Sequence, residues 1–334
     1  MGAETMEGKP QNRSMHAARA SKQDEFYTQL SDIEKELRNY TEHFKGKSVL
    51  CNCDDPKISN FFHYFSHNFE RLKLKKLFTT CYKNSHADLF STHTAEKGLY
   101  LEYNGDKNGR RVPDPNDIGI HEFKSDGDFR SEECVKLLKQ ADIVVTNPPY
   151  SLFREYVAQL VEHKRKFLII GNVNASTYKE CFELIKANRM WLGYNCVRHF
   201  ARPDGSMFEC ARSFWYTNLD TPKRHEELVL FRAYNPTDYP AYDNYDAIEV
   251  SKAVDIPMDY DGAMGVPITF LDKYNPKQFE ILGITDRGNA WGLKTRKYTD
   301  SDVPNPGDLN RRAAIKIGKT YKATYARLLI RKKK

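Results

Sequence analysis

The segment Asp142-Ile-Val-Val-Thr-Asn147-Pro148-Pro149-Tyr150 carries the strongest structural signal in this chain of 334 residues. Its first half is an apolar, β-branched run of strand length, and the two consecutive prolines stop a strand and stiffen the chain that leaves it. A helical pattern follows over residues 152–163. The segment is therefore predicted to fold as a buried strand, a rigid turn and a helix, with the turn at the carboxyl end of the strand.

Short strands alternate with longer helices on both sides of this segment. Strands are expected at residues 48–53, 76–81, 167–170, 213–217, 228–232, 247–250 and 267–271, and helices at 25–44, 132–140 and 177–188. This alternation requires crossover connections and predicts an α/β fold with a mostly parallel sheet. Ligands of such sheets bind at the carboxyl ends of the strands. Three of these ends carry unusual residues: 51–56, 126–130 and 147–150.

The composition favours a globular protein without a membrane segment. Hydrophobic residues make up 40% of the chain and charged residues 29%. No apolar run approaches the roughly 18 residues of a membrane helix, and the N-terminus lacks the apolar core of a secretory signal. An intracellular, cytoplasmic protein is expected. Residues 1–20 are polar and aperiodic and are expected to be flexible.

The cysteines and histidines do not suggest a metal site. The seven cysteines have no regular spacing, and the pair Cys51 and Cys53 has no second pair to complete a zinc site. His63 and His67 lie four residues apart, as metal ligands on a helix would, but no third ligand accompanies them. Reduced, partly buried cysteines and ordinary helix histidines are expected, and no metal.

The positive charge gathers at the C-terminal end. Residues 287–334 hold 14 Lys and Arg against three Asp, a surplus of 11, so the rest of a chain of net charge +7 sums to −4. A polyanionic partner is expected at this end. The alternative is a solubilising tail, but the basic residues are interleaved with Tyr and Ile, as on a folded surface. The predicted DNA-binding residues here are Arg311, Arg312, Lys316 and Lys319.

The turn at 147–150 suits methyl transfer to an exocyclic amine. The amino nitrogen of adenine is a poor nucleophile, because its lone pair is delocalised into the ring. Two acceptors, the Asn147 side chain and the Pro148 carbonyl, can draw the amine toward a tetrahedral, more nucleophilic state. Pro149 stiffens the turn, and the Tyr150 ring offers a face on which a flat base can stack. These four residues are the predicted catalytic group.

The Asn-Pro-Pro-Tyr signature indicates the type of reaction more specifically than it indicates the substrate. Amino-methyltransferases acting on adenine, on guanine in RNA and on glutamine in proteins share it, so an RNA or protein substrate stays open. A capping Asn with a surface Tyr is the purely structural alternative. A third possibility is a protein that binds DNA but has lost catalysis, since a glycine-rich loop is missing after the first predicted strand.

Longer blocks give a specific resemblance. Seven segments occur in one order between about residue 22 and about residue 282: Asp24-Glu-Phe-Tyr-Thr28, Cys51-Asn-Cys-Asp-Asp-Pro56, Ser59-Asn-Phe-Phe62, Gly127-Asp-Phe-Arg-Ser131, Asp142 through Tyr156, Lys166 through Asn174, and Gly265-Val-Pro-Ile-Thr-Phe-Leu271. Together they resemble the EcoRI-type adenine-specific (N6) DNA methyltransferases. The resemblance weakens across residues 194–212 and after 283.

The resemblance implies a Rossmann-like, S-adenosylmethionine-dependent methyltransferase core with a smaller basic recognition region. A catalytic domain is expected over residues 21–225 and a DNA-binding region over 226–334. The substrate would be double-stranded DNA from which an adenine is flipped out, because a base inside a duplex cannot reach the turn. The family also implies a bacterial or phage source, a restriction–modification system with a separately acting endonuclease, and a monomer.

The resemblance also assigns cofactor residues. Asp128 and Phe129 match the position expected to meet the cofactor adenine, and Asn147 borders the cofactor. Phe26, Tyr27 and Thr28 match a segment that closes over the cofactor, with a helix start packed on the core as the alternative. Cys53, Asp54 and Asp55 stand where a glycine-rich loop is usual. Either aspartate could bind the methionine amino group or cap the next helix.

Two features are left without an assignment or are only weakly supported. The second predicted strand ends in Thr79-Thr-Cys-Tyr82 without an acidic residue, so no ribose ligand can be named. Arg198 and Arg202, with His199 and Arg212, fall in a polar loop that could enter a DNA groove or simply face solvent.

Overall fold

The structure, a computed structural model, describes residues 27–53, 59–82, 97–105, 113, 115–201, 206–286 and 292–333. The chain divides into two compact units. The first comprises Met1–Asn172 and Asn195–Trp215, and the second comprises Val173–Tyr194 and Tyr216–Lys334. The chain passes from one unit to the other within two long strands and after Asn172. The predicted functional division at residues 225 and 226 stays a prediction.

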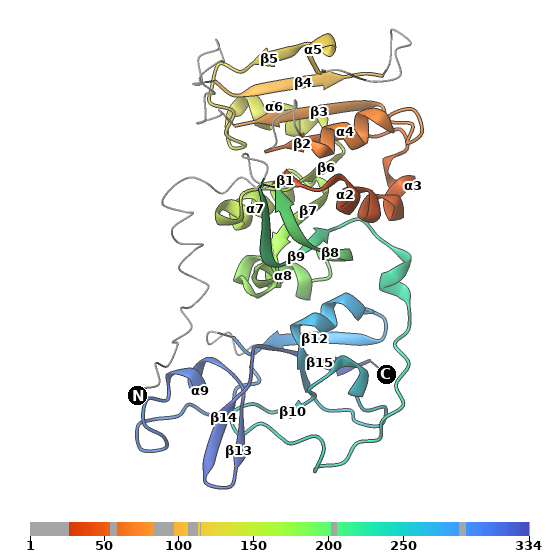
Figure 1. The fold of residues 1–334 in the computed structure, drawn as a ribbon. Helices are drawn as coiled ribbons and strands as arrows, with labels where there is room; N and C mark the ends of the chain where they lie inside the picture. The colour runs from red at the N-terminus through yellow and green to blue at the C-terminus, as the bar shows by residue number, and fades with distance from the viewer. Residues whose placement is uncertain are drawn as a thin grey trace, which may run out of the picture. The chain divides into compact units, whose positions relative to one another are not determined.

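The first unit is built on a nine-stranded sheet of order β1-β8-β9-β7-β6-β2-β3-β4-β5 (Figure 1). The strands are β1 (Tyr27–Thr28), β2 (Ser48–Asn52), β3 (Lys76–Cys81), β4 (Leu99–Tyr103), β5 (Ile120–Glu122), β6 (Ile143–Thr146), β7 (Lys166–Asn172), β8 (Trp191–Ala201) and β9 (Met207–Thr217). The helices are α2 (Leu30–Leu37), η1 (Arg38–Tyr40), α3 (Thr41–Phe44), α4 (Asn60–His67), α5 (Pro115–Ile118), α6 (Glu132–Gln140), η2 (Tyr150–Leu152) and α7 (Phe153–Glu162).

Parallel pairing occupies the centre of this sheet. β2 pairs in parallel with both β3 and β6, and β6 pairs in parallel with β7. The edges are antiparallel, at β1 with β8 and at β3, β4 and β5. The mixed α/β fold is therefore confirmed, but the predicted parallel character holds for the four central strands and not for the edges. The chain runs from β2 outward to β3 and then returns to β6 on the other side, so the strand order reverses between β2 and β6.

Burial explains why these segments form strands. Every residue of β2 and of β6 is buried, which suits strands covered on both faces by crossover helices. The helix α4 presents buried aromatic residues: Phe61, Phe62, Tyr64 and Phe65. The hydroxyls of Ser59 and Ser131 accept backbone hydrogen bonds at 3.3 Å and cap the N-termini of α4 and α6. Sequence and packing therefore agree over the core of this unit.

The second unit contains a small sheet and a separate hairpin. The four-stranded sheet has the order β10-β11-β15-β12, and β13 pairs only with β14. The strands are β10 (Ile248–Glu249), β11 (Met264–Pro267), β12 (Phe279–Ile284), β13 (Ala314–Ile317), β14 (Thr320–Ala323) and β15 (Arg327–Lys332). The helices are η3 (Val173–Thr177), α8 (Lys179–Lys186), η4 (Pro222–His225), η5 (Ala253–Asp255), η6 (Ile268–Lys273) and α9 (Gly307–Arg311).

Three predicted elements differ in the structure. Residues 267–271 fold mainly as the 3₁₀ helix η6 instead of a strand. Residues 228–232 form no regular strand: the Leu228 backbone pairs with the Gln278 side chain, and in this segment only Arg232 makes an isolated bridge. Residues 25–44 contain the short strand β1 before the first helix and a 3₁₀ turn between α2 and α3.

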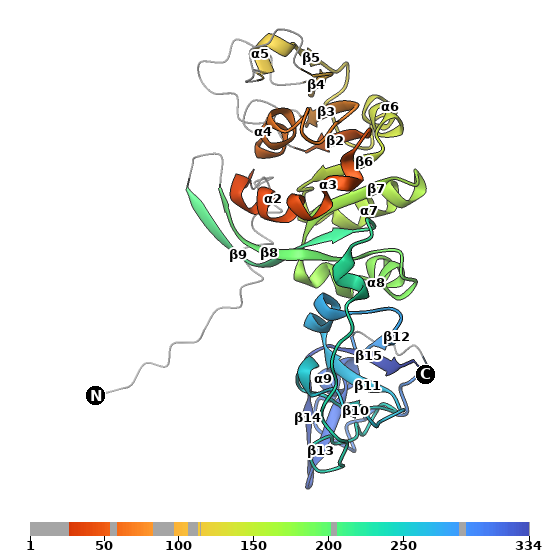
Figure 2. The ribbon, with the colours of Figure 1, turned by 90° about the vertical axis from the view of Figure 1, so that its right-hand side faces the viewer.

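The prediction of a polar loop around Arg198 is wrong. Arg198 and His199 lie on β8, and Arg212 lies on β9; both strands have 11 residues. Figure 2 shows β8 and β9 as a long curved pair. Residues 198–212 were not predicted as strand because exposed polar and charged residues, among them Arg198, His199 and Arg212, interrupt the apolar pattern there. Within the part of the chain that the structure describes, no helix has both the length and the apolar character needed to cross a membrane.

Candidate active site

The Asn-Pro-Pro-Tyr turn leaves the carboxyl end of β6, as predicted. Asn147 is 8% exposed and Pro148 is buried, whereas Pro149 and Tyr150 are partly exposed. Pro149 has the extended backbone that precedes the short η2 helix, after which α7 begins. The strand order reverses beside β6, and open α/β sheets bind ligands at such a point. The turn is thus placed where the fold class puts a ligand.

The Tyr150 side chain is fixed by the β8–β9 pair. Its hydroxyl lies 2.7 Å from the Ser213 hydroxyl on β9, and its ring meets the Phe200 ring of β8 edge-on with centroids 6.5 Å apart. Ser213 and Phe200 are fully buried. The sequence assigned neither residue to the site: Phe200 lies in the segment 194–212, where the resemblance weakens, and Ser213 was expected only as the start of a strand. Because Phe200 contacts the edge of the Tyr150 ring and Ser213 contacts its hydroxyl, the ring keeps one orientation.

The pairing of β1 with β8 brings β1 to this end of the sheet. Thr28 pairs with Phe200 across the β1–β8 ladder, and the Thr28 carbonyl accepts a 2.8 Å hydrogen bond from the Asn60 side chain at the start of α4. The Thr28 hydroxyl is buried and has no hydrogen-bond partner among the described residues. A buried hydroxyl is costly unless it is paired. Thr28 therefore stays a candidate for the cofactor role that the resemblance implies.

A buried hydrogen-bond network joins the ends of β2 and β6. The Thr146 hydroxyl donates to the Asn52 carbonyl, and the Tyr156 hydroxyl donates to Asn52 Oδ1. Tyr156 lies on α7, which follows the turn, and burial raises its pKa well above the ordinary value. Its phenol therefore stays a protonated donor. The network holds the β2 end, the β6 end and α7 in one arrangement.

The chain turns sharply after β2. Cys53 has a φ of 74°, a left-handed conformation that residues other than glycine rarely adopt. Cys53 belongs to the segment 51–56, in which the sequence has no glycine. Backbone strain of this kind gathers at ligand-binding positions. Among the predicted cofactor residues, Asp54 and Asp55 follow immediately but lie outside the described residues, as does Phe26.

The loop 126–130 packs tightly on the end of β3. Gly127 has a φ of +76°, and a Cβ there would lie 2.4 Å from the Cys81 carbonyl oxygen, so only glycine permits this approach. The neighbouring Phe129 is 7% exposed and meets the Tyr156 ring edge-on at 5.1 Å. Asp128 and Phe129 are thus brought to the carboxyl end of the parallel strands.

Asp128 is already engaged by a neighbouring cation. Its carboxylate accepts from the Arg130 backbone at 2.8 Å and from the guanidinium at 2.9 and 2.7 Å. These hydrogen bonds from Arg130 lower the pKa of Asp128, so the carboxylate stays charged. Oδ2 accepts only one of them, which leaves it able to accept another donor. The sequence alone assigned no role to Arg130. In the structure Arg130 orients Asp128, the residue predicted to meet the cofactor adenine.

The structure supplies an acidic residue that the sequence of β3 lacks. Burial, and next the charge of Asp126, raise the pKa of Tyr82, the residue that follows β3. Asp126 therefore lies beside the end of β3, although it comes from the loop before α6. Sequence reasoning looked for a carboxylate at the end of the strand itself and could not find this one.

The remaining predicted residues lie on separate elements. Arg198 is exposed on β8, and Arg202 lies outside the described residues. Arg311 ends α9, Arg312 follows it, Lys316 lies on β13, and Lys319 lies in the turn before β14. In the described residues, no group of three or more His, Cys, Asp or Glu side chains is placed to hold a metal ion.

Replacing Tyr156 with Phe tests the buried network. The Tyr156→Phe variant is expected to lose about 1–3 kcal/mol in free energy of unfolding, because Asn52 Oδ1 is left buried without its donor. Chemical denaturation monitored by circular dichroism measures the loss. Tyr100→Phe is the control, since the Tyr100 hydroxyl makes no hydrogen bond among the described residues. Equal stability of the two variants would show that the network contributes nothing.

Comparisons with known proteins agree on one family. A family model described as "Adenine-specific methyltransferase EcoRI" matches residues 14–333. The Escherichia coli protein named Type II methyltransferase M.EcoRI is 51% identical over 291 residues, covering 81% of this chain and 89% of the relative. Two Mycoplasma proteins are more distant. M.MgeORF184P of Mycoplasma genitalium is 36% identical over 329 residues, covering 90% of this chain and 97% of the relative.

M.MpnI of Mycoplasma pneumoniae is 36% identical over 314 residues, covering 86% of this chain and 92% of the relative. Both Mycoplasma proteins are named Type II methyltransferases. No solved structure matches the chain. The sequence matches extend through both compact units.

Proposed function

This chain belongs to the EcoRI family of adenine-specific DNA methyltransferases, and from that premise we propose that it transfers the methyl group of S-adenosylmethionine to N6 of an adenine flipped out of duplex DNA. The chain is thus an enzyme of the methyltransferase class. The observation that supports the detailed proposal most strongly is the Asn147–Tyr150 turn, fixed at the point where the strand order of the sheet reverses.

The turn supplies acceptors for the target amine. The Asn147 side chain and the Pro148 carbonyl accept the two N–H groups of N6, which localises the lone pair on nitrogen. A neutral amide suffices, because the amine loses its proton during or after attack on the methyl group. Both residues are buried, which excludes competing water and strengthens the hydrogen bonds. The rigid Pro-Pro backbone contributes positioning.

Tyr150 receives the flipped base. Extraction of a base from the duplex costs a few kcal/mol, and stacking on an aromatic ring offsets about 1–3 kcal/mol of that cost. Contacts with Ser213 and Phe200 hold the ring before the base arrives, so little side-chain entropy is lost on binding. The β8–β9 pair thereby has a role in base capture.

The cofactor site is proposed at the ends of β2 and β3. S-adenosylmethionine supplies an electrophilic methyl group when bound. The Thr28 hydroxyl, the strained Cys53 turn and the 126–129 loop are the features of this chain that fit it. Asp128 would accept from the purine amino group and Phe129 would pack on the purine. The carboxylate of Asp126 is the candidate for the ribose hydroxyls. Phe26, Tyr27, Asp54 and Asp55 complete the set inferred from the family resemblance.

The remaining expectations are also proposals. We assign DNA recognition to the region 226–334 and a Rossmann-like catalytic role to 21–225. The names of the relatives support a place in a restriction–modification system, with a separate endonuclease as functional partner. A monomer acting in the cytoplasm of a bacterium, or encoded by a phage, is the form in which we expect the enzyme.

Transfer of a labelled methyl group tests the function directly. Purified protein with deuterated S-adenosylmethionine is incubated separately with duplex DNA, transfer RNA and a glutamine-containing protein extract. Mass spectrometry of the digests is expected to find labelled N6-methyldeoxyadenosine in DNA alone. Labelled RNA or glutamine would favour the other amino-methyltransferase classes. No product, with cofactor binding intact, would favour an inactive DNA-binding relative.

Neutralising single cations is expected to weaken DNA binding without changing its sequence preference. Arg312→Ala or Lys316→Ala should lower the affinity for all duplexes alike and reduce the slope of log K against log salt by about one. Fluorescence anisotropy across a salt series measures both. A changed base preference would mean that these residues contact bases and not phosphates.

A further inference from the structure

The β13–β14 hairpin differs from the rest of the second unit in how its charges are used. The 26 residues from Leu309 to Lys334 hold ten Lys and Arg and no acidic residue. On β15 the cations are paired: Arg327 with Glu249 at 2.7 Å and Arg331 with Glu280 at 3.0 Å. Five cations lie in or beside the hairpin, and none of them forms an ion pair with a described acidic residue: Arg311, Arg312, Lys316, Lys319 and Lys322.

The hairpin is a short ribbon with a tight turn. Ile317 pairs with Thr320, and Gly318 between them has a φ of +58°, as the first position of a type II′ turn requires. Its four-residue strands give a ribbon about 13 Å long. Ile317 is 56% exposed at the tip beside Thr320, Lys319 and Lys322, all exposed. Figures 1 and 2 show the turn pointing away from the four-stranded sheet of this unit.

The base of the hairpin is anchored on both sides. Ala313 is buried with Tyr242, Tyr245 and Leu329, and Ile315 packs against that cluster. Ala314 is buried against Tyr298 and Leu309, where Tyr321 and Ala323 also pack. The two faces of the ribbon therefore contact two separate apolar clusters near its base. The tip has no such support and faces solvent.

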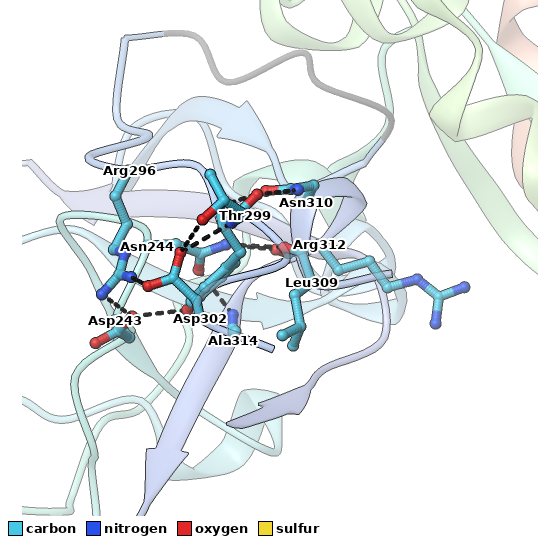
Figure 3. Close-up of polar contacts among 10 residues, drawn as sticks. Asp243, Asn244, Arg296, Thr299, Asp302, Leu309, Asn310, Arg312 and Ala314 are labelled. Atoms are coloured by element: carbon cyan, nitrogen blue, oxygen red, sulfur yellow. Dashed lines mark hydrogen bonds and ion pairs between the residues drawn. The ribbon is translucent and has the colours of Figure 1, made fainter. Parts of the chain in front are cut away.

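One buried side chain fixes the backbone that enters the hairpin. Asn244 is fully buried, and its amide nitrogen donates to the carbonyls of Leu309 and Arg312 at 3.0 and 2.9 Å. Its Oδ1 accepts from the Ala314 amide at 2.8 Å. Figure 3 shows Asn244 among these groups, with the Arg312 side chain extending away from them. Asn244 is a positioning residue for the ribbon.

Two acidic residues of this support, Asp243 and Asp302, are neutralised within it. Arg296 pairs with Asp243 at 3.1 Å and with Asp302 at 2.6 Å (Figure 3). The Tyr298 hydroxyl also donates to Asp243. The Arg296 guanidinium also lies over the Tyr298 ring at 4.7 Å. Arg296 therefore stabilises the support, whereas the hairpin lysines form no ion pair with a described acidic residue and can bind a partner.

From these observations we propose that the β13–β14 hairpin enters the major groove of DNA as a two-stranded ribbon. The major groove admits a two-stranded ribbon and is about 8.5 Å deep, which the projecting ribbon can span. Ile317 and Thr320 at the tip face base edges, where an apolar side chain can contact the methyl group of thymine. Lys316, Lys319 and Lys322 contact the flanking phosphates. This inference deepens the proposed function and rests on DNA being the substrate.

Selection from a duplex library tests the hairpin without requiring methylation. Wild-type protein with S-adenosylhomocysteine is expected to enrich one motif. Ile317→Ala combined with Thr320→Ala should lower the preference for that motif over scrambled DNA by about tenfold, which matches the discrimination of one good base contact. Binding to scrambled duplex should stay within twofold. Lys316→Ala with Lys319→Ala should weaken both duplexes alike.

Lys252→Ala is the matched control, an exposed lysine of the same unit outside the hairpin. Because Ile317 and Thr320 are exposed, their replacement leaves the buried clusters intact, and thermal unfolding verifies this. An unchanged motif and unchanged preference in the tip variant would overturn the inference while methyltransferase activity stands. Loss of preference in a protein that methylates no DNA would support the inference and refute the proposed function. Enrichment of no motif by the wild type would overturn the inference.

Discussion

Asn147→Ala is expected to lower the rate of methyl transfer to DNA by about 10²- to 10³-fold, the usual loss when one positioned hydrogen-bonding group is removed from an active site. The hydrogen bond from N6 to the amide strengthens as the amine becomes tetrahedral, so the loss should fall mainly on kcat. Binding of S-adenosylhomocysteine should fall by only a few-fold, because Asn147 merely borders the cofactor and the β2 and β3 ends are untouched. Single-turnover kinetics on a methylatable duplex measure the step.

Two further variants sharpen the test at Asn147. Asn147→Asp keeps an acceptor oxygen at the same place and should retain more activity than the Ala variant. Asn104→Ala removes an exposed amide after β4 and should behave as wild type. If Asn147→Ala transfers methyl groups within threefold of the wild-type rate, the amide is not an acceptor for the target amine, and the turn has a structural role only.

Tyr150→Ala is expected to reduce kcat/KM for DNA by about 5- to 150-fold, which corresponds to the 1–3 kcal/mol of one base stacked on an aromatic ring. Tyr150→Phe keeps the ring and its edge contact with Phe200 but loses the 2.7 Å hydrogen bond to Ser213. We therefore expect Tyr150→Phe to lose only a few-fold.

A duplex carrying 2-aminopurine at the target position reports base flipping for these two variants. Wild type and Tyr150→Phe should give a similar fluorescence change, and Tyr150→Ala a weaker one. Ser213→Ala is a matched control for the hydroxyl pair and should resemble Tyr150→Phe. Should Tyr150→Phe be as impaired as Tyr150→Ala, the hydroxyl and not the ring face would be the feature that matters.

The sequence predicted the part of the site that follows local rules. Two prolines after an apolar run mark the end of β6 and the turn. The family blocks added Asp128 and Phe129, which the tight Gly127 turn brings to the end of β3. These features depend on residues near one another in the chain.

Contacts between distant segments could not be predicted. The Tyr156 to Asn52 bond joins residues 104 positions apart, and the Tyr150 to Ser213 pair joins residues 63 apart. Asp126 lies beside the end of β3 although its loop precedes α6. Residues 198–212 of the β8–β9 pair were taken for a polar loop because exposed strand positions carry charges that interrupt the apolar pattern. Asn244 is another such case, since its importance depends on three backbone groups 65 to 70 residues away.

The central claim is that this chain methylates adenine in DNA through the Asn147 turn. Its most direct test is expression of wild type and Asn147→Ala in a methylation-deficient bacterial host, followed by single-molecule sequencing that detects N6-methyladenine. The account predicts modified adenine in one fixed motif for the wild type and a largely unmodified genome for the variant, with equal soluble protein in both. An unmodified wild-type genome, or the same modified motif at full occupancy in both strains, would contradict it.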